Sequence, residues 1–265
     1  YGPILLSDSP VVAEVLALAG YSHIIVDHEH SATDVRSGQS MLQAIQAAGA
    51  ISKTPTTPIV RLPSANDAVY IKKVLDTMQL PGGVLVPMVD DAATAEAVVR
   101  ALRYPSNTQQ GIRGCAMPFV RASGWGTHNI EEYLRQCRED LLVMVQVETP
   151  TGVAAIPEIA RVNGVDATFL GPLDLSASLG KVGQFEDPEF KALMEKAERM
   201  VLESSSDCLL AGFRVQGRDL NDMFAKGYSL VCGTVDSALL RNAAQADALA
   251  GRAAIEDVTI MRSSS

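Results

Sequence analysis

Cysteine, aromatic residues and positive charge are all scarce in this chain of 265 residues. Its four cysteines (Cys115, Cys137, Cys208 and Cys232) form no C-x-x-C pair and have no histidine at zinc-finger spacing, which argues against a disulfide framework or a structural zinc site. A net charge of −9 argues against nucleic acid or an anionic membrane as partner, because both attract basic surfaces. No apolar run approaches the roughly 20 residues of a membrane span. We therefore expect a cytoplasmic protein; the chain starts at Tyr1 rather than Met, so a targeting segment would lie outside this sequence.

Aromatic residues make up only 5% of the chain and hydrophobic residues 47%, so Ala, Val and Leu must provide most of the packing. This composition is typical of α/β proteins, whose buried parallel strands are short aliphatic runs. Eight such runs are present, each followed by helix-like sequence: Ile4–Ser7, His23–Asp27, Pro58–Arg61, Gly83–Pro87, Leu142–Glu148, Ala167–Leu170, Cys208–Phe213 and Tyr228–Cys232. Eight strand–helix units in one domain, residues 1–265, favour an α/β fold of the TIM (β/α)8 barrel type. The alternative, a doubly wound sheet, would place a glycine-rich phosphate loop after the first strand, and none follows Ile4–Ser7.

Amphipathic segments predict helices between these strands, and two of them begin with a polar residue before proline, at Ser9-Pro10 and Asp187-Pro188. Such segments include Pro10–Ala19, Ala65–Asp76, Asp91–Arg103, Asp187–Ser204 and Arg218–Lys226. An Ala- and Leu-rich stretch at Asp236–Ala254 predicts an extra C-terminal helix. The region Tyr104–Thr127 interrupts the alternation with glycine and proline, and a loop of that length inside a compact domain is usually functional.

Polar residues stand at the carboxyl ends of four predicted strands, where the active site of a TIM barrel lies. They are Asp27, His28, Glu29 and His30 after the second strand, Arg61 at the end of the third, Gln146 and Glu148 at the end of the fifth, and Asp174 after the sixth. Two carboxylates on neighbouring strand ends, Glu148 and Asp174, suit a hard divalent cation such as Mg2+ or Mn2+. An arginine beside such a site can stabilise a developing oxyanion, and a histidine flanked by carboxylates can take or give a proton. Together these groups favour enolate chemistry next to a carboxylate, on a small 2-oxo acid.

Lysine is missing from all eight predicted strands. The other common route to an enolate equivalent is a Schiff base between a lysine and the carbonyl group of the substrate. The absence of a strand lysine therefore argues against an imine mechanism and for a metal.

Six segments of the chain, taken together and in this order, resemble the HpcH/HpaI aldolase family. They are 26–30 (VDHEH), 60–63 (VRLP), 83–89 (GVLVPMV), 111–114 (GIRG), 146–149 (QVET) and 171–176 (GPLDLS). The likeness runs from near Ile4 to about Val235. It implies a class II pyruvate aldolase, a carbon–carbon lyase that uses a divalent metal (Mg2+, with Mn2+ or Co2+ as alternatives) to cleave a 4-hydroxy-2-oxo acid to pyruvate and an aldehyde.

The resemblance also implies a role for individual residues. It implies that Glu148 and Asp174 bind the metal and that Gln146, the backbone amide of Leu173 and Arg61 bind pyruvate. Arg61 would also stabilise the enolate. His30 would be the proton acceptor, Asp76 the acid that raises the basicity of His30, and Asp27 and Glu29 supporting acids. The family commonly forms hexamers from dimers that exchange a C-terminal helix. We therefore expect a homo-oligomer in which Asp236–Ala254 packs on, or is exchanged with, a neighbouring subunit.

The sequence departs from the family pattern in places that concern the substrate. Leu173 replaces the small residue that is frequent before the metal-binding Asp, Ala47–Pro58 is a long connection, Met78–Gly82 carries an extra residue, and Ala116–His128 is divergent. The sequence therefore does not indicate which aldehyde forms the other half of the substrate.

Three other functions stay open at this point. The same enolate could be made by decarboxylating oxaloacetate, which needs the metal and Arg61 but hardly needs His30. A citryl- or malyl-thioester lyase of the wider family ranks lower, because the segment from Asp27 to His30 resembles the free-acid aldolases. A catalytically silent binding protein ranks lowest, because buried charges at strand ends cost several kcal/mol unless they are used.

Each candidate residue also has a purely structural reading. Asp174 could cap the helix that follows it, and His30 could be an ordinary surface histidine. Arg61 could be an ion-pair partner of the acids after the second strand, and Asp76 is an ordinary residue for a helix end. The functional reading rests on their occurring together.

Overall fold

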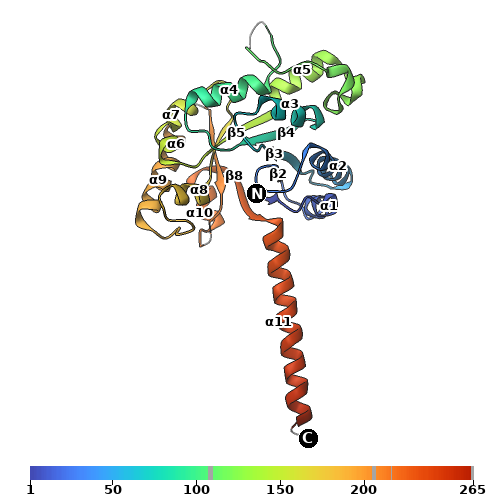
Figure 1. Ribbon diagram of the computed structural model, residues 1–265, viewed down its shortest axis with the longest axis vertical. Helices are drawn as coiled ribbons and strands as arrows, with labels where there is room; N and C mark the ends of the chain where they lie inside the picture. The colour runs from blue at the N-terminus through green and yellow to red at the C-terminus, as the bar shows by residue number, and fades with distance from the viewer. Residues whose placement is uncertain (107–109, 205–206, 216, 264–265) are drawn as a thin grey trace.

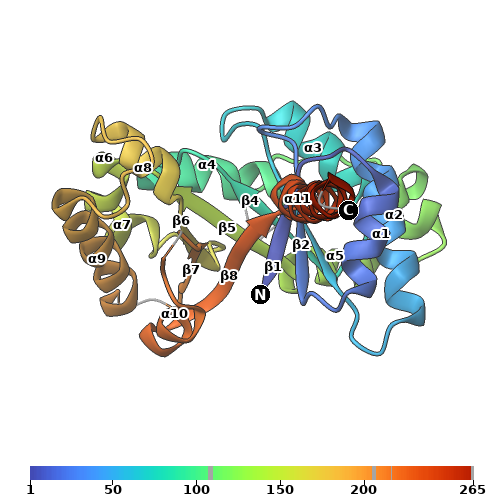
Figure 2. The ribbon, with the colours of Figure 1, turned by 90° about the horizontal axis from the view of Figure 1, so that it is seen from below.

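Eight parallel strands close into a barrel in the computed structural model, which describes residues 1–106, 110–204, 207–215 and 217–263. Each strand pairs with the next along the chain and β8 pairs with β1 (Figures 1 and 2). The strands are β1 (Gly2–Leu5), β2 (His23–Asp27), β3 (Thr57–Arg61), β4 (Gly82–Val86), β5 (Leu141–Val147), β6 (Ala167–Leu170), β7 (Leu209–Phe213) and β8 (Tyr228–Val235). The predicted TIM barrel is confirmed.

Helices follow the strands and form the outer layer of the barrel (Figure 1). They are α1 (Pro10–Leu18), α2 (Val35–Ile51), α3 (Ala68–Thr77), α4 (Ala92–Leu102), α5 (Ile130–Glu139), α6 (Pro150–Ala154), α7 (Ile156–Ile159), α8 (Pro172–Ser178), α9 (Pro188–Glu203), α10 (Leu220–Lys226) and α11 (Asp236–Ser263), with two short 3-10 helices, η1 (Met117–Phe119) and η2 (Arg121–Gly126), between α4 and α5. The predicted N-caps are confirmed: the side chains of Ser9 and Asp187 accept hydrogen bonds from backbone amides in the first turns of α1 and α9.

Helix α2 follows the second strand, where helix-like sequence was expected but its bounds were not predicted. It starts with a reciprocal cap, in which Asp34 accepts a hydrogen bond from the Ser37 amide at 2.8 Å and the Ser37 hydroxyl accepts one from the Asp34 amide. Its buried residues include Met41, Leu42 and Ile45, at the spacing of one helix face. Because α2 ends at Ile51, the connection to β3 is shorter than the sequence suggested.

Two apolar layers hold the barrel together. One fills its interior and consists of side chains from alternate strand positions, among them Ile25, Ile59, Met144 and Phe169. The other lies between the strands and the helices. Since strand residues alternate between these layers, polar side chains are free to gather only where the strands end.

Helix α11 projects away from the barrel (Figure 1) and runs to Ser263, beyond the predicted end at Ala254. Its first residue, Asp236, is buried and its carboxylate accepts hydrogen bonds from the amides of Leu6 (2.8 Å) and Ser7 (3.1 Å). These bonds anchor the base of α11 to the end of β1. None of the helices in the described residues is long and apolar enough to cross a membrane.

Candidate active site at the carboxyl end of the barrel

Asp27 organises the end of β2 and the turn that follows it. The register of β2 and β3 sets Asp27 beside Arg61, and the two form a bidentate pair with N–O distances of 2.7 and 2.8 Å. The same carboxylate accepts hydrogen bonds from the backbone amides of Glu29 (3.1 Å) and His30 (3.2 Å). One buried acid therefore fixes both the guanidinium and the turn, because bidentate charge-assisted bonds are strong and directional.

Arg61 is held by a second acid as well. Its third nitrogen, Nη1, lies 3.1 Å from Oε2 of Glu29, so Asp27 and Glu29 together engage the whole guanidinium. The side chain of Arg61 is only 10% exposed. The arginine is thus a fixed positive charge at the mouth of the barrel, suited to a developing oxyanion.

Glu148 follows β5 and is buried, with 2% of its surface exposed. The Gln146 amide group donates to Oε1, and the backbone N–H of Met88 donates to Oε2 at 3.0 Å. Gly171, after β6, packs against the same carboxylate: a Cβ atom there would lie 2.5 Å from Oε1, so only glycine allows this approach. Two neighbouring strand ends thus enclose Glu148, while Asp174 lies exposed in the first turn of α8.

Burial, with a smaller contribution from neighbouring carboxylates, disfavours the charged forms of Glu148 and Glu29. Burial, and to a smaller extent the charges of Asp174 and Glu29, raise the pKa of Glu148 to about 7, although hydrogen bonds from Gln146 and Met88 act to lower it. Burial likewise raises the pKa of Glu29 to about 7, partly offset by Arg61. A cation among these groups would remove that repulsion.

The donor atoms fit a hard divalent cation. Glu148 and Asp174 offer carboxylate oxygens, and Oε1 of Gln146 is buried without a hydrogen-bond partner. Within the part of the chain that the structure describes, no three histidine, cysteine, aspartate or glutamate side chains gather around one point as metal ligands do. Protein side chains would therefore supply two ligands, leaving the other positions to water and substrate, as is usual for Mg2+.

His30 and Asp76 lie in different surroundings. The His30 imidazole is 59% exposed, and its Nε2 lies 3.6 Å from Oε2 of Glu29. Asp76, near the end of α3, accepts a hydrogen bond from the buried Arg113 at 2.8 Å, and Arg113 stacks on the Tyr104 ring at 4.3 Å. The hydrogen bonds and ion pairs of the described residues do not join Asp76 to His30, and the role of Asp76 stays a prediction.

Met88 supports the site, and the buried His28 links the turn after β2 to α3, although the sequence analysis assigned neither a role. The backbone of Met88 has a φ of 54°, a left-handed conformation rare outside glycine, and in it the amide points at Glu148. Nδ1 of the buried His28 lies 2.9 Å from the Tyr70 hydroxyl on α3. A positive φ leaves no mark in the sequence, whereas His28 stood in the quoted segment and its burial could have been suspected.

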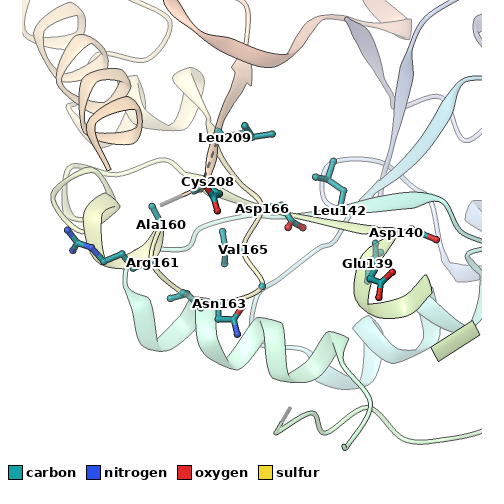
Figure 3. Close-up of a pocket in the computed structure, with 14 residues that line it drawn as sticks. Glu139, Asp140, Leu142, Ala160, Arg161, Asn163, Val165, Asp166, Cys208 and Leu209 are labelled. Carbon is teal, nitrogen blue, oxygen red and sulfur yellow. Dashed lines mark hydrogen bonds between the residues drawn. The ribbon is translucent and has the colours of Figure 1, made fainter. Parts of the chain in front are cut away.

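A cavity of about 700 Å3 lies at the opposite end of the barrel, at the start of β5 to β7 (Figure 3). Asp140, Asp166 and Cys208 are among its lining residues. Asp166 accepts a hydrogen bond from the Val143 amide at 2.7 Å, which ties it to the barrel. The cavity holds none of the strand-end groups described above, so its size does not mark the catalytic site.

Comparison with known proteins agrees with this geometry. Residues 4–243 match the family model described as HpcH/HpaI aldolase/citrate lyase. The chain belongs to this family. The resemblance predicted from the six segments is thereby confirmed.

Relatives in the HpcH/HpaI family include proteins with names and solved structures. The 4-hydroxy-2-oxo-heptane-1,7-dioate aldolase of Escherichia coli is 38% identical over 88% of this chain and 83% of its own length. An HpcH/HpaI aldolase/citrate lyase family protein from Burkholderia cenocepacia superposes with a TM-score of 0.85 at 31% identity, covering 95% of this chain and 94% of that one. An HpcH/HpaI aldolase from Desulfitobacterium hafniense superposes with a TM-score of 0.77 at 26% identity, covering 93% and 91%.

Proposed function

We propose that this chain is a metal-dependent aldolase that cleaves a 4-hydroxy-2-oxo acid to pyruvate and an aldehyde. The observation that carries the proposal is the buried Glu148 carboxylate, held by Gln146 and Met88, on the same face as the fixed guanidinium of Arg61. The name of the E. coli relative supports the same reaction class.

Glu148 and Asp174 would hold the cation, for which Mg2+ is the first choice and Mn2+ or Co2+ are alternatives. Bound there, the metal would supply Lewis-acid polarisation of the 2-oxo group of the substrate. Gln146 and the backbone amide of Leu173 would orient the pyruvate half by hydrogen bonds. The Gln146 amide nitrogen carries two N–H groups; one donates to Glu148, and the other would donate to an oxygen of the pyruvate half, while the free Oε1 could accept a hydrogen bond from a bound water.

Arg61 would stabilise the negative charge that develops on the enolate oxygen when the bond between C3 and C4 breaks. His30 would take the proton of the 4-hydroxyl group, directly or through water, with Glu29 beside it. Asp27 acts through Arg61 and the turn, since it holds both. For Asp76, a contact with His30 is proposed from the family pattern alone.

Decarboxylation of oxaloacetate is a second candidate on the same groups. One observation favours it: Arg61 and Glu148 are buried and fixed, whereas His30 is mostly exposed and has one long contact with Glu29. A reaction that needs no base would use only the fixed part of the site.

Removal of divalent metal is expected to stop pyruvate release completely. The protein would be treated with EDTA, dialysed and assayed with a 4-hydroxy-2-oxo acid, with lactate dehydrogenase and NADH reporting pyruvate. Activity should return with Mg2+, Mn2+ or Co2+, because polarisation of the 2-oxo group is worth several kcal/mol. Turnover that survives full metal removal would contradict the proposal.

We also propose a homo-oligomer, a dimer or a hexamer, in which α11 packs against a neighbouring subunit. Leu240 and Leu249 on this helix are 70% and 64% exposed, although apolar residues usually become buried. Light scattering should give a mass well above the 28.2 kDa of one chain; a monomer at micromolar concentration would contradict the proposal.

The four cysteines form no disulfide in the described residues and three of them are buried, which suits the reducing cytoplasm, where we propose that the enzyme works.

A further inference from the structure

Two apolar side chains stand exposed beside the Glu148 carboxylate. Met88 follows β4 and is 50% exposed, and its own amide is bonded to Oε2 of Glu148. Leu173 follows β6 and is 55% exposed; it directly precedes Asp174 and lies two residues after Gly171, which packs on Oε1 of Glu148. Since β4 and β6 are the two neighbours of β5, these side chains flank the carboxylate from both sides.

Acidic side chains outnumber basic ones on this face. Asp27, Glu29, Glu148 and Asp174 gather there against the single guanidinium of Arg61. The Nε and Nη2 atoms of that guanidinium donate to Asp27, and Nη1 lies 3.1 Å from Oε2 of Glu29. With the carboxylates ionised, one divalent cation would leave the face negative, and the carboxylate of pyruvate would add to that charge.

Arg214, just after β7, is another candidate for binding a second carboxylate. Ala211 and Phe213 pack in the barrel interior, so strand alternation directs Arg214 outward, towards the helix layer. Its Nε donates to the backbone carbonyl of Arg218 at 2.7 Å. Both arginines at these strand ends are thus held by other groups: Arg61 by Asp27 and Glu29, and Arg214, through its Nε, by the backbone carbonyl of Arg218.

From this apolar and negative surrounding we propose that the aldehyde half of the substrate is neutral and apolar, with its chain packed on Met88 and Leu173. The inference rests on the aldolase function proposed above. In the synthetic direction, C3 of the pyruvate enolate bonds to the aldehyde carbon, the carbonyl π electrons move to its oxygen, and that oxygen takes a proton. The rest of the aldehyde then points away from the carboxylates, and a charged end would be repelled there. The dicarboxylate in the E. coli relative's name would be a poor substrate for this chain.

Butanal and 4-oxobutanoate test this directly, because both have four carbons and differ in the terminal carboxylate. With pyruvate and Mg2+ or Mn2+, kcat/KM for butanal should exceed that for 4-oxobutanoate by about tenfold or more. A higher salt concentration should reduce this difference in kcat/KM, since salt screens the repulsion between the aldehyde carboxylate and the acidic side chains. A higher kcat/KM for 4-oxobutanoate would overturn the inference.

Three variants test the contact residues. Leu173→Ala and Met88→Ala should each lower the ratio of kcat/KM for butanal to kcat/KM for ethanal by about tenfold, because the shorter side chain packs less well against the longer aldehyde. Leu173→Arg should shift preference towards 4-oxobutanoate. Leu202→Ala changes a comparably exposed leucine on α9 and should leave the ratio as it is. Unchanged ratios in both alanine variants would contradict the assigned contacts.

Exchange of the pyruvate methyl protons in D2O separates the two proposals. Metal-dependent exchange, followed by NMR, reports enolate formation without any aldehyde. Absence of exchange would refute the aldolase function and this inference with it. Exchange together with a preference for 4-oxobutanoate would refute this inference alone.

Discussion

Glu148→Gln is expected to abolish metal-dependent turnover, with kcat/KM falling by about 1,000-fold or more. The substitution keeps the shape of the side chain but removes one of the two carboxylates proposed to hold the cation. Several kcal/mol of Lewis-acid stabilisation would be lost, at 1.36 kcal/mol per decade of rate. The substituted amide also has a single oxygen, so it cannot accept hydrogen bonds from both Gln146 and Met88 through two oxygens as the carboxylate does.

Thermal unfolding gives this prediction a second readout. A metal that binds the folded state alone raises the melting temperature of the wild type, and Glu148→Gln should lose this rise. The matched control is Glu198→Gln, which changes another buried carboxylate, one on α9 that pairs with Arg218 and Lys226. That variant should melt at a lower temperature yet keep the metal-induced rise. A full metal response in Glu148→Gln would show that this carboxylate is not a ligand.

His30→Ala is expected to separate aldol cleavage from decarboxylation. Cleavage of a 4-hydroxy-2-oxo acid needs a base for the hydroxyl proton, so its kcat should fall by about 100- to 10,000-fold. Decarboxylation of oxaloacetate forms the same enolate without that proton transfer and should persist. Because His30 is 59% exposed, the variant should fold normally.

Arg61→Lys is the companion variant and should lower both activities. Lysine cannot reproduce the bidentate pair with Asp27, so its positive charge would not be held where the guanidinium is. Equal loss of both activities in His30→Ala, or full aldolase activity in that variant, would remove His30 from the proposed mechanism.

Much of the site could be predicted because the fold class was readable. Eight aliphatic runs predicted a closed parallel barrel, and in such a barrel all carboxyl strand ends meet on one face. Glu148, Arg61 and Asp27 were therefore expected on one face although they are far apart in sequence, and the structure places them there. Helix α2, whose bounds were not predicted, shows the limit of this reading: its glycines, Gly38 and Gly49, and its polar residues obscured an apolar face that only packing reveals.

The sequence by itself determined the barrel, the family and the candidate residues of the site, because hydrophobic periodicity and residue order are local properties. Only the tertiary structure decided which groups touch. Arg61 pairs with Asp27 and Glu29, and the Met88 amide donates to Glu148. Asp76 pairs with Arg113, and α11 projects away from the barrel. These contacts depend on strand register and on single backbone angles, which arise only when distant segments pack against one another.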